Sequence, residues 1–452
     1  MKTKLTAKEY VYVASMLFGM FFGAGNLICP AYMGQMAGSN VWQAIPGFLI
    51  TGVGMPLLGV AALGASRSEG LYDLSSKVSK PYAMFFTCAL YLTIGPFFAI
   101  PRCATVSYTV GLEQLLGSSD NLWVYLLIFS FLFFAAALFF SLYPGNILTW
   151  IGKILNPFFL LFLAVLVIVA SVNPSAAISE VEPLGNYATK PFFTGFLEGY
   201  NTMDALASLA FGIVVVQVIR GLGVKQPEHV AVNTIFSGIF SCILMAVIYV
   251  AVTIMSTQSR GALDAADNGG VALAQIADHY MGKAGLIVLA ATVTLACLKT
   301  AVGLITSCSE TFSALFPKIS YKAWAIIFST FSFGVANLGL SAIISYSIPV
   351  LMFLYPLAIV LILLALFGKS FGHDRAVYRW TIGFTFIAAL YDLMAALPSN
   401  VKSALNLSGI IETIGGLLPM SSLGLGWLCP AAIGLVIGLV IHAVNVGKTQ
   451  KA

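Results

Sequence analysis

The stretch Phe18-Gly19-Met20-Phe21-Phe22-Gly23-Ala24-Gly25-Asn26-Leu27-Ile28, with Pro30 shortly after it, interrupts an apolar segment over residues 9–38. Glycines beside a polar side chain disfavour a continuous helix in lipid, because every backbone N–H and C=O there needs a partner. Unwound backbone at membrane depth is tolerated only where it is buried in protein or lines a cavity. The stretch therefore predicts a broken helix, with a simple kink or a closely packed glycine as the alternative.

A second interruption of the same kind lies in the apolar segment over residues 191–219. The run Glu198-Gly199-Tyr200-Asn201-Thr202-Met203-Asp204 places acidic, amide and hydroxyl side chains inside that segment. A polar cluster at membrane depth is expected to line a cavity or to be buried in protein. What the two interruptions indicate together depends on which of the chain's successive apolar segments contain them.

The composition is that of a membrane protein. Of 452 residues, 59% are hydrophobic and only 9% are charged, and the mean hydropathy is +0.95. A soluble domain carries about 25% charged residues. The basic residues are scattered between apolar segments, so a net charge of +5 does not indicate nucleic-acid binding. The seven cysteines and four histidines are dispersed without metal-ligand spacing, so we expect no metal site and no cofactor.

Segments of about 20 apolar residues are long enough to span a bilayer. Twelve qualify: 9–38, 42–65, 82–116, 121–142, 145–172, 191–219, 230–257, 284–315, 322–339, 342–368, 377–397 and 422–446. The interrupted segments are the first and the sixth, and interruptions at corresponding places in two halves indicate a transporter built from inverted repeats. We therefore expect an all-α polytopic protein with one five-helix repeat over residues 1–172, a second over 191–368, and two additional helices over 377–446, forming a single transport unit.

The lysines and arginines predict the orientation. If the N-terminus is cytoplasmic, sixteen of the 22 lie at cytoplasmic positions, from Lys2 to Lys451, and four at outer positions. The four are Lys190, Arg260, Lys283 and Lys402. This positive-inside bias predicts that both termini are cytoplasmic and that the number of spans is even.

A pair of broken helices offers a site for a small zwitterion. The start of one half-helix exposes N–H groups that attract a carboxylate, and the end of another exposes C=O groups that coordinate a small cation. An amino acid fits this pairing, with its ammonium at Asp204 or at the carbonyls of residues 200–203. Apolar neighbours such as Phe21, Phe22 and Leu206 then line a pocket for an aliphatic side chain, with ordinary core packing as the alternative for the aromatic residues. The candidate substrate-binding residues are Phe21, Gly23, Ala24, Gly25, Asn26, Tyr200, Met203 and Asp204.

Three further ionisable residues within apolar segments are candidates for a functional role. Lys299 is in the middle of the stretch 285–303, where a lysine costs roughly 2.5–3.5 kcal/mol or more and is by default a functional candidate. Arg102 either neutralises a carboxylate or carbonyl cluster or lies near a helix break. Glu198 either caps the break in the sixth segment or gates an outer vestibule.

Three runs together resemble the family of branched-chain amino acid carriers, the branched-chain amino acid:cation symporters. They are residues 18–28, the run Gly95-Pro96-Phe97-Phe98-Ala99-Ile100-Pro101-Arg102, and residues 199–206. The resemblance covers essentially the whole chain. It implies a bacterial inner-membrane uptake system for leucine, isoleucine and valine, coupled to sodium. It also implies the leucine-transporter fold of two inverted five-helix repeats, with the substrate site at the two breaks.

The resemblance also implies a sodium site between the first and eighth segments. Its ligands are the carbonyls of Gly19, Phe22 and Ala296, with two hydroxyl positions that fall at Lys299 and Thr300. The lysine departs from the family's pattern, in which a pair of threonines is usual. An ammonium about 4 Å from a sodium ion repels it by roughly 4 kcal/mol at an effective dielectric constant of 20.

We hypothesise that the Lys299 ammonium replaces the sodium ion and donates to the carbonyls of Gly19, Phe22 and Ala296 and to the Thr300 hydroxyl. Such a lysine is either a titrating proton carrier or a fixed charge that gives transport without a coupling ion. The alternative is that Lys299 turns away or pairs with an acid and leaves a weakened sodium site. The coupling ion is therefore Na⁺, H⁺ or none.

Other function classes fit the sequence less well. A channel filter loop is not found, and neither are the nucleophile, base and metal motifs of an intramembrane enzyme. An amino-acid sensor on a transporter scaffold stays open, although no soluble signalling domain is recognisable. The expected partners are a branched-chain amino acid and the lipid bilayer. The sequence fixes neither the oligomeric state nor the preference among the three substrates.

Overall fold

The computed structural model describes residues 2–117, 121–143 and 146–449, and within these ranges every regular element is helical. Met1 and Lys451, which the expected repeat bounds and orientation include, lie outside the described residues. The first half of the described chain contains α1 (Ala7–Phe21), α2 (Ala24–Ala37), α3 (Val41–Leu49), α4 (Met55–Ala65), α5 (Leu71–Ser76), α6 (Lys80–Leu92), α7 (Ala99–Ser107), α8 (Glu113–Leu116), α9 (Leu122–Leu142) and α10 (Asn146–Val172).

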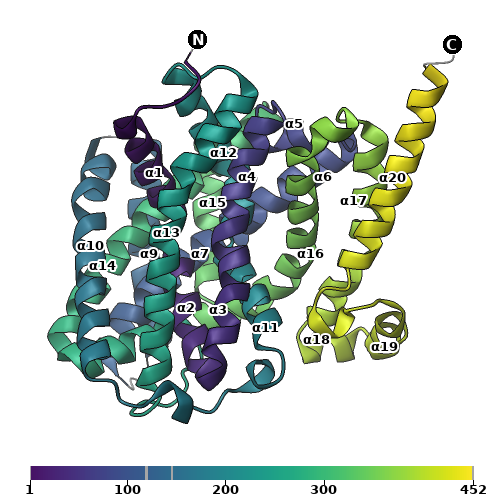
Figure 1. Ribbon diagram of the computed structural model, residues 1–452. Helices are drawn as coiled ribbons and strands as arrows, with labels where there is room; N and C mark the ends of the chain where they lie inside the picture. The colour runs from purple at the N-terminus through teal and green to yellow at the C-terminus, as the bar shows by residue number, and fades with distance from the viewer. Residues whose placement is uncertain (1, 118–120, 144–145, 450–452) are drawn as a thin grey trace.

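The second half continues the same architecture (Figure 1). It contains α11 (Pro191–Glu198), α12 (Asp204–Gly221), α13 (Pro227–Ser259), α14 (Gly269–Leu315), α15 (Tyr321–Ala336), α16 (Leu340–Leu366), α17 (Arg375–Ala396), α18 (Ser399–Ala404), α19 (Ser408–Leu417) and α20 (Leu428–Thr449). The first span is α1 with α2 and the sixth is α11 with α12. Both spans are broken where the sequence predicts.

The second and third spans are less regular than expected. Turns of π-helix at Ile50–Gly54, Thr93–Phe97 and Tyr108–Leu112 interrupt them, and Gly95 has non-helical backbone angles (φ −96°, ψ −124°). For the third span the sequence leaves open a helix break near Arg102, but it does not predict π turns, because apolar composition does not reveal a change in hydrogen-bond register. The turns at Thr93–Phe97 and Tyr108–Leu112 lie on either side of α7, the helix that carries Arg102.

The two halves of the chain run in opposite directions. From the end of the molecule that carries both termini, here called the terminal face, α1 and α2 lead to the opposite, distal face, whereas α11 and α12 lead back (Figure 1). Contacts between helices follow the same symmetry. The first span (α1 and α2) packs against the seventh span, α13. In the same way the sixth span (α11 and α12) packs against the second span, which contains α3 and α4. This is the arrangement of two inverted five-helix repeats.

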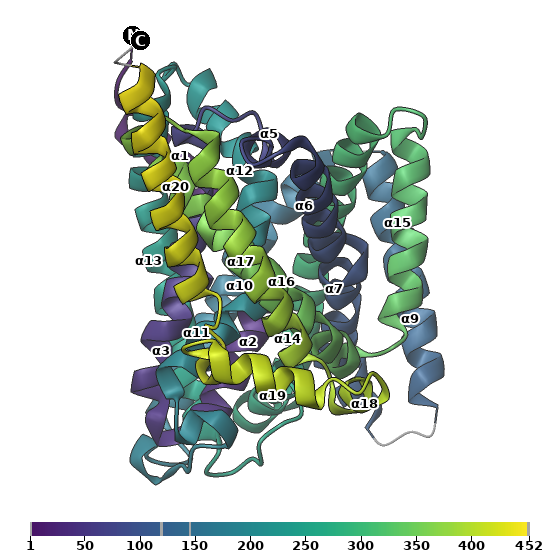
Figure 2. The same ribbon diagram turned by 90° about the vertical axis from the view of Figure 1, so that its right-hand side faces the viewer.

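The surface and the span count fit a polytopic membrane protein. Eight helical runs among the described residues are long and apolar enough to cross a membrane, and one of them, Gly25–Ala65, contains parts of two spans. These eight runs therefore represent nine spans, and α10, α15 and α17 are the fifth, ninth and eleventh, which gives twelve transmembrane helices. Large apolar side chains face outward, among them Phe131, Leu132 and Ile387, which are 60%, 61% and 71% exposed. Both termini lie at the terminal face, as an even number of spans requires (Figure 2).

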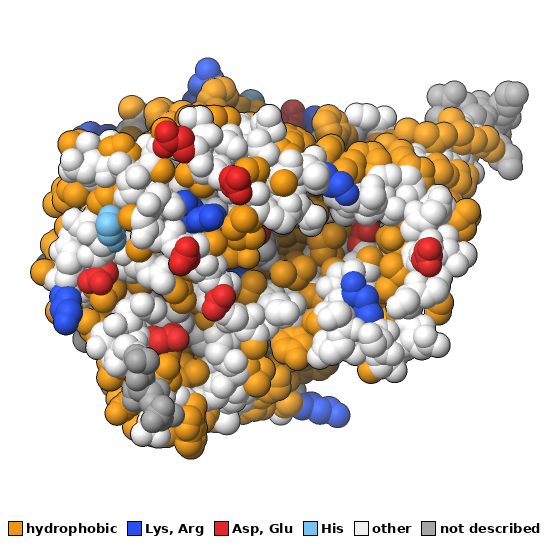
Figure 3. All heavy atoms as spheres, turned by 90° about the horizontal axis from the view of Figure 1, so that it is seen from below, with side chains coloured by type: hydrophobic (Ala, Val, Ile, Leu, Met, Phe, Trp, Pro, Cys, Tyr) orange, Lys and Arg blue, Asp and Glu red, His pale blue; other side chains and the backbone are white. Residues whose placement is uncertain are grey.

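Beside the repeats, α17 packs against α16 and α20 packs against α17, and α18 and α19 lie below them at the distal end (Figures 1 and 2). On the distal face α14 begins close against the broken first span. A Cβ on Gly269 would overlap the backbone carbonyl of Ile28 in α2, so only glycine permits this approach. Seen from below, the distal face is hollowed near its centre (Figure 3).

Candidate functional site

The break in the first span is held open by one side chain. Helix α1 ends at Phe21 and α2 begins at Ala24. The backbone N–H of Gly23 donates to the Asn26 Oδ1 atom over 2.9 Å, so the side chain of Asn26 satisfies a group that the break leaves without a helical partner.

The break in the sixth span is a single tight turn. Helix α11 ends at Glu198, residues Gly199–Thr202 form a 3-10 turn, and α12 begins at Asp204. Between them Met203 adopts the left-handed conformation (φ 62°), which is uncommon for a residue with a side chain. A residue held in such a conformation costs about 1–3 kcal/mol and is often part of a functional site.

The two breaks meet in the centre of the molecule. The Asn26 Nδ2 atom donates to Asp204 Oδ2 over 2.5 Å, and the Tyr249 hydroxyl donates to the same oxygen over 3.4 Å. Asn26 Nδ2 also contacts the Tyr249 hydroxyl. Asn26 and Asp204 are only 2% and 4% exposed. The position where Gly25 would carry a Cβ is 3.2 Å from the Thr202 carbonyl oxygen, so glycine lets the two breaks approach.

Arg102 completes this junction from α7. Its Nη1 atom donates to the backbone carbonyl of Asn201 in the sixth-span turn. The side chain is 3% exposed, and its Nε and Nη2 atoms have no hydrogen-bond partner among the described residues. A buried guanidinium with free donors therefore lies beside both breaks.

A cavity of about 240 Å³ lies on the distal side of the junction. We call it the distal cavity. It is lined by side chains from α2, α7, the sixth-span break and the starts of α14 and α16, among them Cys29, Tyr32, Arg102, Glu198, Asn201 and Ser345.

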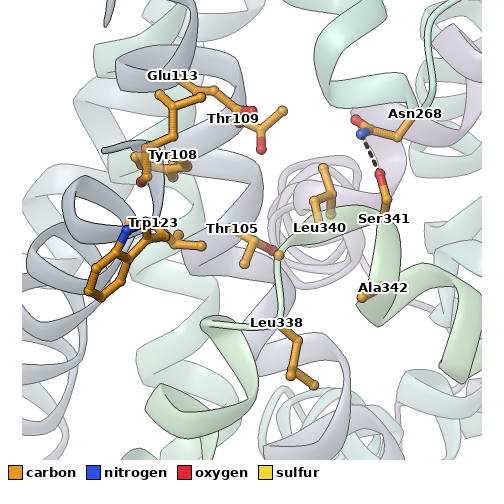
Figure 4. A pocket seen from close by; sticks show the side chains of 13 residues that line it. Thr105, Tyr108, Thr109, Glu113, Trp123, Asn268, Leu338, Leu340, Ser341 and Ala342 are labelled. Atoms are coloured by element: carbon orange, nitrogen blue, oxygen red, sulfur yellow. Dashed lines mark hydrogen bonds between the residues drawn. The ribbon is translucent and has the colours of Figure 1, made fainter. Parts of the chain in front are cut away.

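A second cavity, of about 250 Å³, adjoins the first (Figure 4). Its walls include Thr105, Tyr108 and Glu113. Asn268 and Ser341 line both cavities, and the Asn268 Nδ2 atom donates to the Ser341 hydroxyl over 3.0 Å, the dashed line in Figure 4. This bond joins the starts of α14 and α16 between the two cavities.

The structure brings most of the predicted substrate-binding residues together. Gly23, Gly25, Asn26, Met203 and Asp204 all lie at the two breaks. The side chain of Ala24 lies outside the described part of the chain.

Two aromatic residues on the predicted list lie differently. Phe21 is 6% exposed and faces a separate, very small void of about 10 Å³ beside α4 and α13. Tyr200 stacks on Tyr355 of α16, with ring centroids 4.1 Å apart. Sequence reasoning missed both Tyr249 and Tyr355, since each lies in an unbroken helix with no polar motif around it.

A profile of the family described as branched-chain amino acid transport proteins matches residues 6–445. The chain belongs to that family. It is 54% identical over 434 residues to branched-chain amino acid permease BrnQ of Lactobacillus delbrueckii subsp. lactis, with 96% of each chain covered. It is 41% identical to permease BrnQ of Bacillus subtilis (98% of each chain) and 38% identical to the branched-chain amino acid transport system 2 carrier protein of Pseudomonas aeruginosa (100% of this chain, 99% of that one).

Solved structures agree on the fold. The inward-facing conformation of Mhp1 matches with a TM-score of 0.62 at 15% identity, covering 97% of this chain and 91% of that one. MhsT in complex with L-phenylalanine matches with a TM-score of 0.55 at 15% identity, covering 98% and 99%. Both have the leucine-transporter fold, which confirms the expected fold class. As a member of a family of membrane transport proteins, the chain is a transporter and not an enzyme.

The cation site that the family resemblance implies can be compared with this geometry. Helix α14 does face the first break, because a Cβ on Gly23 would lie 3.4 Å from Thr300 Cγ2. The Thr300 hydroxyl donates to the carbonyl of Ala296 over 3.1 Å. The preceding residue, Lys299, is half-buried and makes no hydrogen bond or ion pair with any residue that the structure describes. The Phe22 N–H bonds to the Phe18 carbonyl over 2.8 Å, and Gly19 is half-buried in the last turns of α1.

Proposed function

We propose that this protein imports leucine, isoleucine and valine across the bacterial cytoplasmic membrane by alternating access. The observation that carries the proposal is the buried bond between Asn26 and Asp204, which joins the two helix breaks into one junction. Broken helices of opposite direction, meeting at mid-membrane beside a cavity, are typical of transporters with inverted repeats. The family, whose members are named for branched-chain amino acids, supports the substrate class.

The substrate site in this proposal is formed by the junction itself. The N-terminal turn of α2, from Ala24 to Asn26, points N–H groups at a carboxylate, and the sixth-span turn supplies backbone carbonyls and the side chains of Tyr200, Met203 and Asp204. The Asp204 Oδ2 atom already accepts hydrogen bonds from Asn26 and Tyr249. The carbonyls of Tyr200, Asn201 and Met203 are occupied as well, by the Met203 N–H, Arg102 and the Ala207 N–H. Within the described residues this leaves the Thr202 carbonyl as the freest backbone partner of the turn for an ammonium.

We propose that the terminal face is cytoplasmic, following the positive-inside bias, and that residues 1–172 and 191–368 are the two repeats, with residues 377–446 added. Fusion of green fluorescent protein to the C-terminus tests the orientation. Fluorescence is expected, since the fluorescent protein matures in the cytoplasm, and a dark but stable fusion would contradict the orientation.

Thermal unfolding with each of the twenty amino acids tests the substrate class. We expect leucine, isoleucine and valine to raise the unfolding midpoint, because a ligand that binds only the folded state stabilises it by about 2.7 kcal/mol at a hundredfold excess over Kd. Each amino acid is measured with and without sodium. If none of the three raises the midpoint under either condition, the proposed substrate class is wrong.

For the coupling ion we propose that the Lys299 ammonium takes the place of sodium beside the first break. The proximity of Thr300 to Gly23, which brings this part of α14 against the first break, supports the proposal. Lys299 makes no hydrogen bond to a described residue in this structure, so the proposal requires its side chain to turn toward these groups. Transport coupled to sodium, as is typical of the family, is the alternative. In that case Lys299 turns away and the carbonyls of Gly19, Phe22 and Ala296 with Thr300 hold the ion.

Leucine uptake into proteoliposomes, measured in sodium, in choline and under an imposed pH gradient, separates these alternatives. If Lys299 replaces the ion, uptake is the same in sodium and choline, and Lys299→Thr gains stimulation by sodium. Sensitivity to the pH gradient then indicates a proton carrier. Strong sodium dependence of the natural protein would contradict the replacement.

A further inference from the structure

We infer that the distal cavity is a zwitterion-binding subsite, in which Arg102 binds the carboxylate and Glu198 the ammonium of the incoming amino acid. The inference rests on the proposed function and adds a specific recognition step to it. Neither the junction of the breaks nor the family resemblance requires this pair of charges.

Arg102 supplies the anion-binding half. Its side chain is 97% buried by area (3% exposed) and lines the distal cavity, yet its Nε and Nη2 atoms have no partner among the described residues. A buried charged donor without a partner is strongly unfavourable, so a ligand acceptor is expected there. A carboxylate matches a guanidinium with two bonds in one plane.

The first turn of α2 reinforces the same preference. The position of a Cβ on Gly25 lies 3.4 Å from the Arg102 Nη1 atom, so the guanidinium is next to the N-terminus of this 14-residue helix. Free N–H groups and the helix dipole favour an anion at that end. The lining of the distal cavity includes α2 only from Ile28 onward, so the helix dipole adds to the positive potential around Arg102, and Arg102 itself contacts the carboxylate.

Glu198 supplies the cation-binding half. It lines the same cavity from the end of α11 and is half-buried, whereas the other acidic residue of the lining, Asp267, is exposed. None of the three ion pairs among the described residues includes Arg102 or Glu198. The two opposite charges thus share one cavity without neutralising each other through a direct ion pair, as a zwitterion receptor requires.

The rest of the wall suits an aliphatic side chain. Ile344 and Ile348 lie one helical turn apart on α16 and face the cavity together, with Ile28 from α2. A volume of about 240 Å³ admits a single small ligand. The cavity therefore combines two fixed charges with an apolar wall, which selects a small zwitterion with an apolar side chain.

Competition against radiolabelled leucine uptake in proteoliposomes tests the pairing of charges. The competitors are leucine, leucinamide, which lacks the carboxylate, and 4-methylpentanoate, which lacks the amine. We expect Arg102→Gln to raise the leucine KM by about 10- to 100-fold, the range for losing hydrogen bonds to a charged group, and to reduce the preference for leucine over leucinamide by the same factor. Glu198→Gln should instead reduce the preference for leucine over 4-methylpentanoate.

Matched controls are Arg375→Gln and Glu412→Gln, which remove exposed charges of the same kinds elsewhere. Both should keep the leucine KM and both preferences. Arg102→Lys keeps the charge and should give an intermediate KM. If Arg102→Gln does not fold, Arg102→Lys and Glu198→Gln together test the subsite in its place. If uptake of leucine is intact but neither analogue preference changes in any folded variant, the subsite is wrong while the proposed function stands. If the natural protein takes up no leucine, the proposed function itself fails and the subsite with it.

Discussion

At the scale of single residues, Asn26 links more of the site than any other side chain named above. Its Oδ1 atom accepts from the Gly23 N–H, and its Nδ2 atom donates to Asp204 and contacts the Tyr249 hydroxyl. The oxygen of this one amide group therefore bonds to the first-span break, and its nitrogen bonds to the sixth-span break. An aspartate could not replace it, because it lacks the donor and would place a second carboxylate beside Asp204.

Asn26→Ala should therefore impair both stability and transport. The Asp204 carboxylate keeps only the longer bond from Tyr249, and loss of a hydrogen bond to a buried charged group costs about 1.5–3 kcal/mol. We expect a lower thermal unfolding midpoint and leucine uptake reduced by about tenfold or more, the change that 1.4 kcal/mol produces.

Asn337→Ala is the matched control, because Asn337 donates to the Phe333 carbonyl near the end of α15, far from the junction in the chain. It should lower the unfolding midpoint slightly and leave the leucine KM unchanged. An Asn26→Ala protein with the uptake rate and KM of the natural chain would contradict the role given to this residue.

The sequence predicts Asn26 and Asp204 as site residues, because each is a polar residue in an interrupted apolar segment. Tyr249 and Tyr355 could not be found in this way. Each is surrounded by ordinary apolar sequence, and its contact with the site arises from the packing of α13 and α16 against the breaks. Such contacts depend on the relative placement of helices, which a single sequence does not contain.

At the scale of the helices, the close approach of the two breaks depends on Gly25. A Cβ there would lie 3.2 Å and 3.3 Å from backbone atoms of Thr202, which cannot move without displacing the sixth-span turn. A Cβ on Gly23 would meet only side-chain atoms at ordinary contact distances, two of Thr300 at 3.4 Å and 3.5 Å and the Asn26 Oδ1 atom at 3.8 Å.

Gly25→Ala should therefore reduce leucine uptake several-fold more than Gly23→Ala does. The measurement is the initial rate of uptake per folded protein, with folding checked by size-exclusion chromatography. The reverse order, with Gly23→Ala the more damaging change, would show that the spacing of the breaks is not what limits transport.

Asn268 connects two helices on the distal side. Its Oδ1 atom caps α14 by accepting from the N–H groups of Gly270 and Val271, at 3.0 Å and 3.1 Å, and its Nδ2 atom donates to Ser341. Asn268→Ala removes both functions, and the cap alone is worth about 1 kcal/mol. We expect it to lower the free energy of unfolding by about 1–2 kcal/mol.

Two variants separate the cap from the link. Asn268→Asp keeps a good capping side chain and loses only the donor to Ser341, and Ser341→Ala removes the same link from the other side. Each should destabilise less than Asn268→Ala in thermal unfolding. A larger loss for Ser341→Ala than for Asn268→Ala would contradict this division.

Helix breaks were predictable because glycines beside polar residues stand out in apolar segments. The π turns that flank α7 were not, since they change which carbonyl each N–H meets without changing the composition. They place Arg102 next to the Asn201 carbonyl, and the cavity that results could not be inferred from the motif around Arg102 alone.

At the scale of the whole molecule, the order of the spans was the most informative property of the sequence. Two interruptions five spans apart predict the inverted repeats, and the opposite directions of the first and sixth spans confirm them (Figure 1). Outward-facing apolar side chains and the position of both termini on one face are consistent with a transporter of twelve membrane-spanning helices. What the order of spans does not fix is the coupling ion, which depends on where one lysine side chain lies.

The measurement that tests the central claim most directly is leucine counterflow, because exchange by alternating access needs no coupling gradient. Proteoliposomes loaded with unlabelled leucine, isoleucine or valine are diluted into a trace of radiolabelled leucine. We predict transient accumulation of label above equilibrium with each of the three, and none with lysine or glutamate inside. Label that enters no faster than in protein-free liposomes, whichever branched-chain amino acid is loaded, would contradict the account.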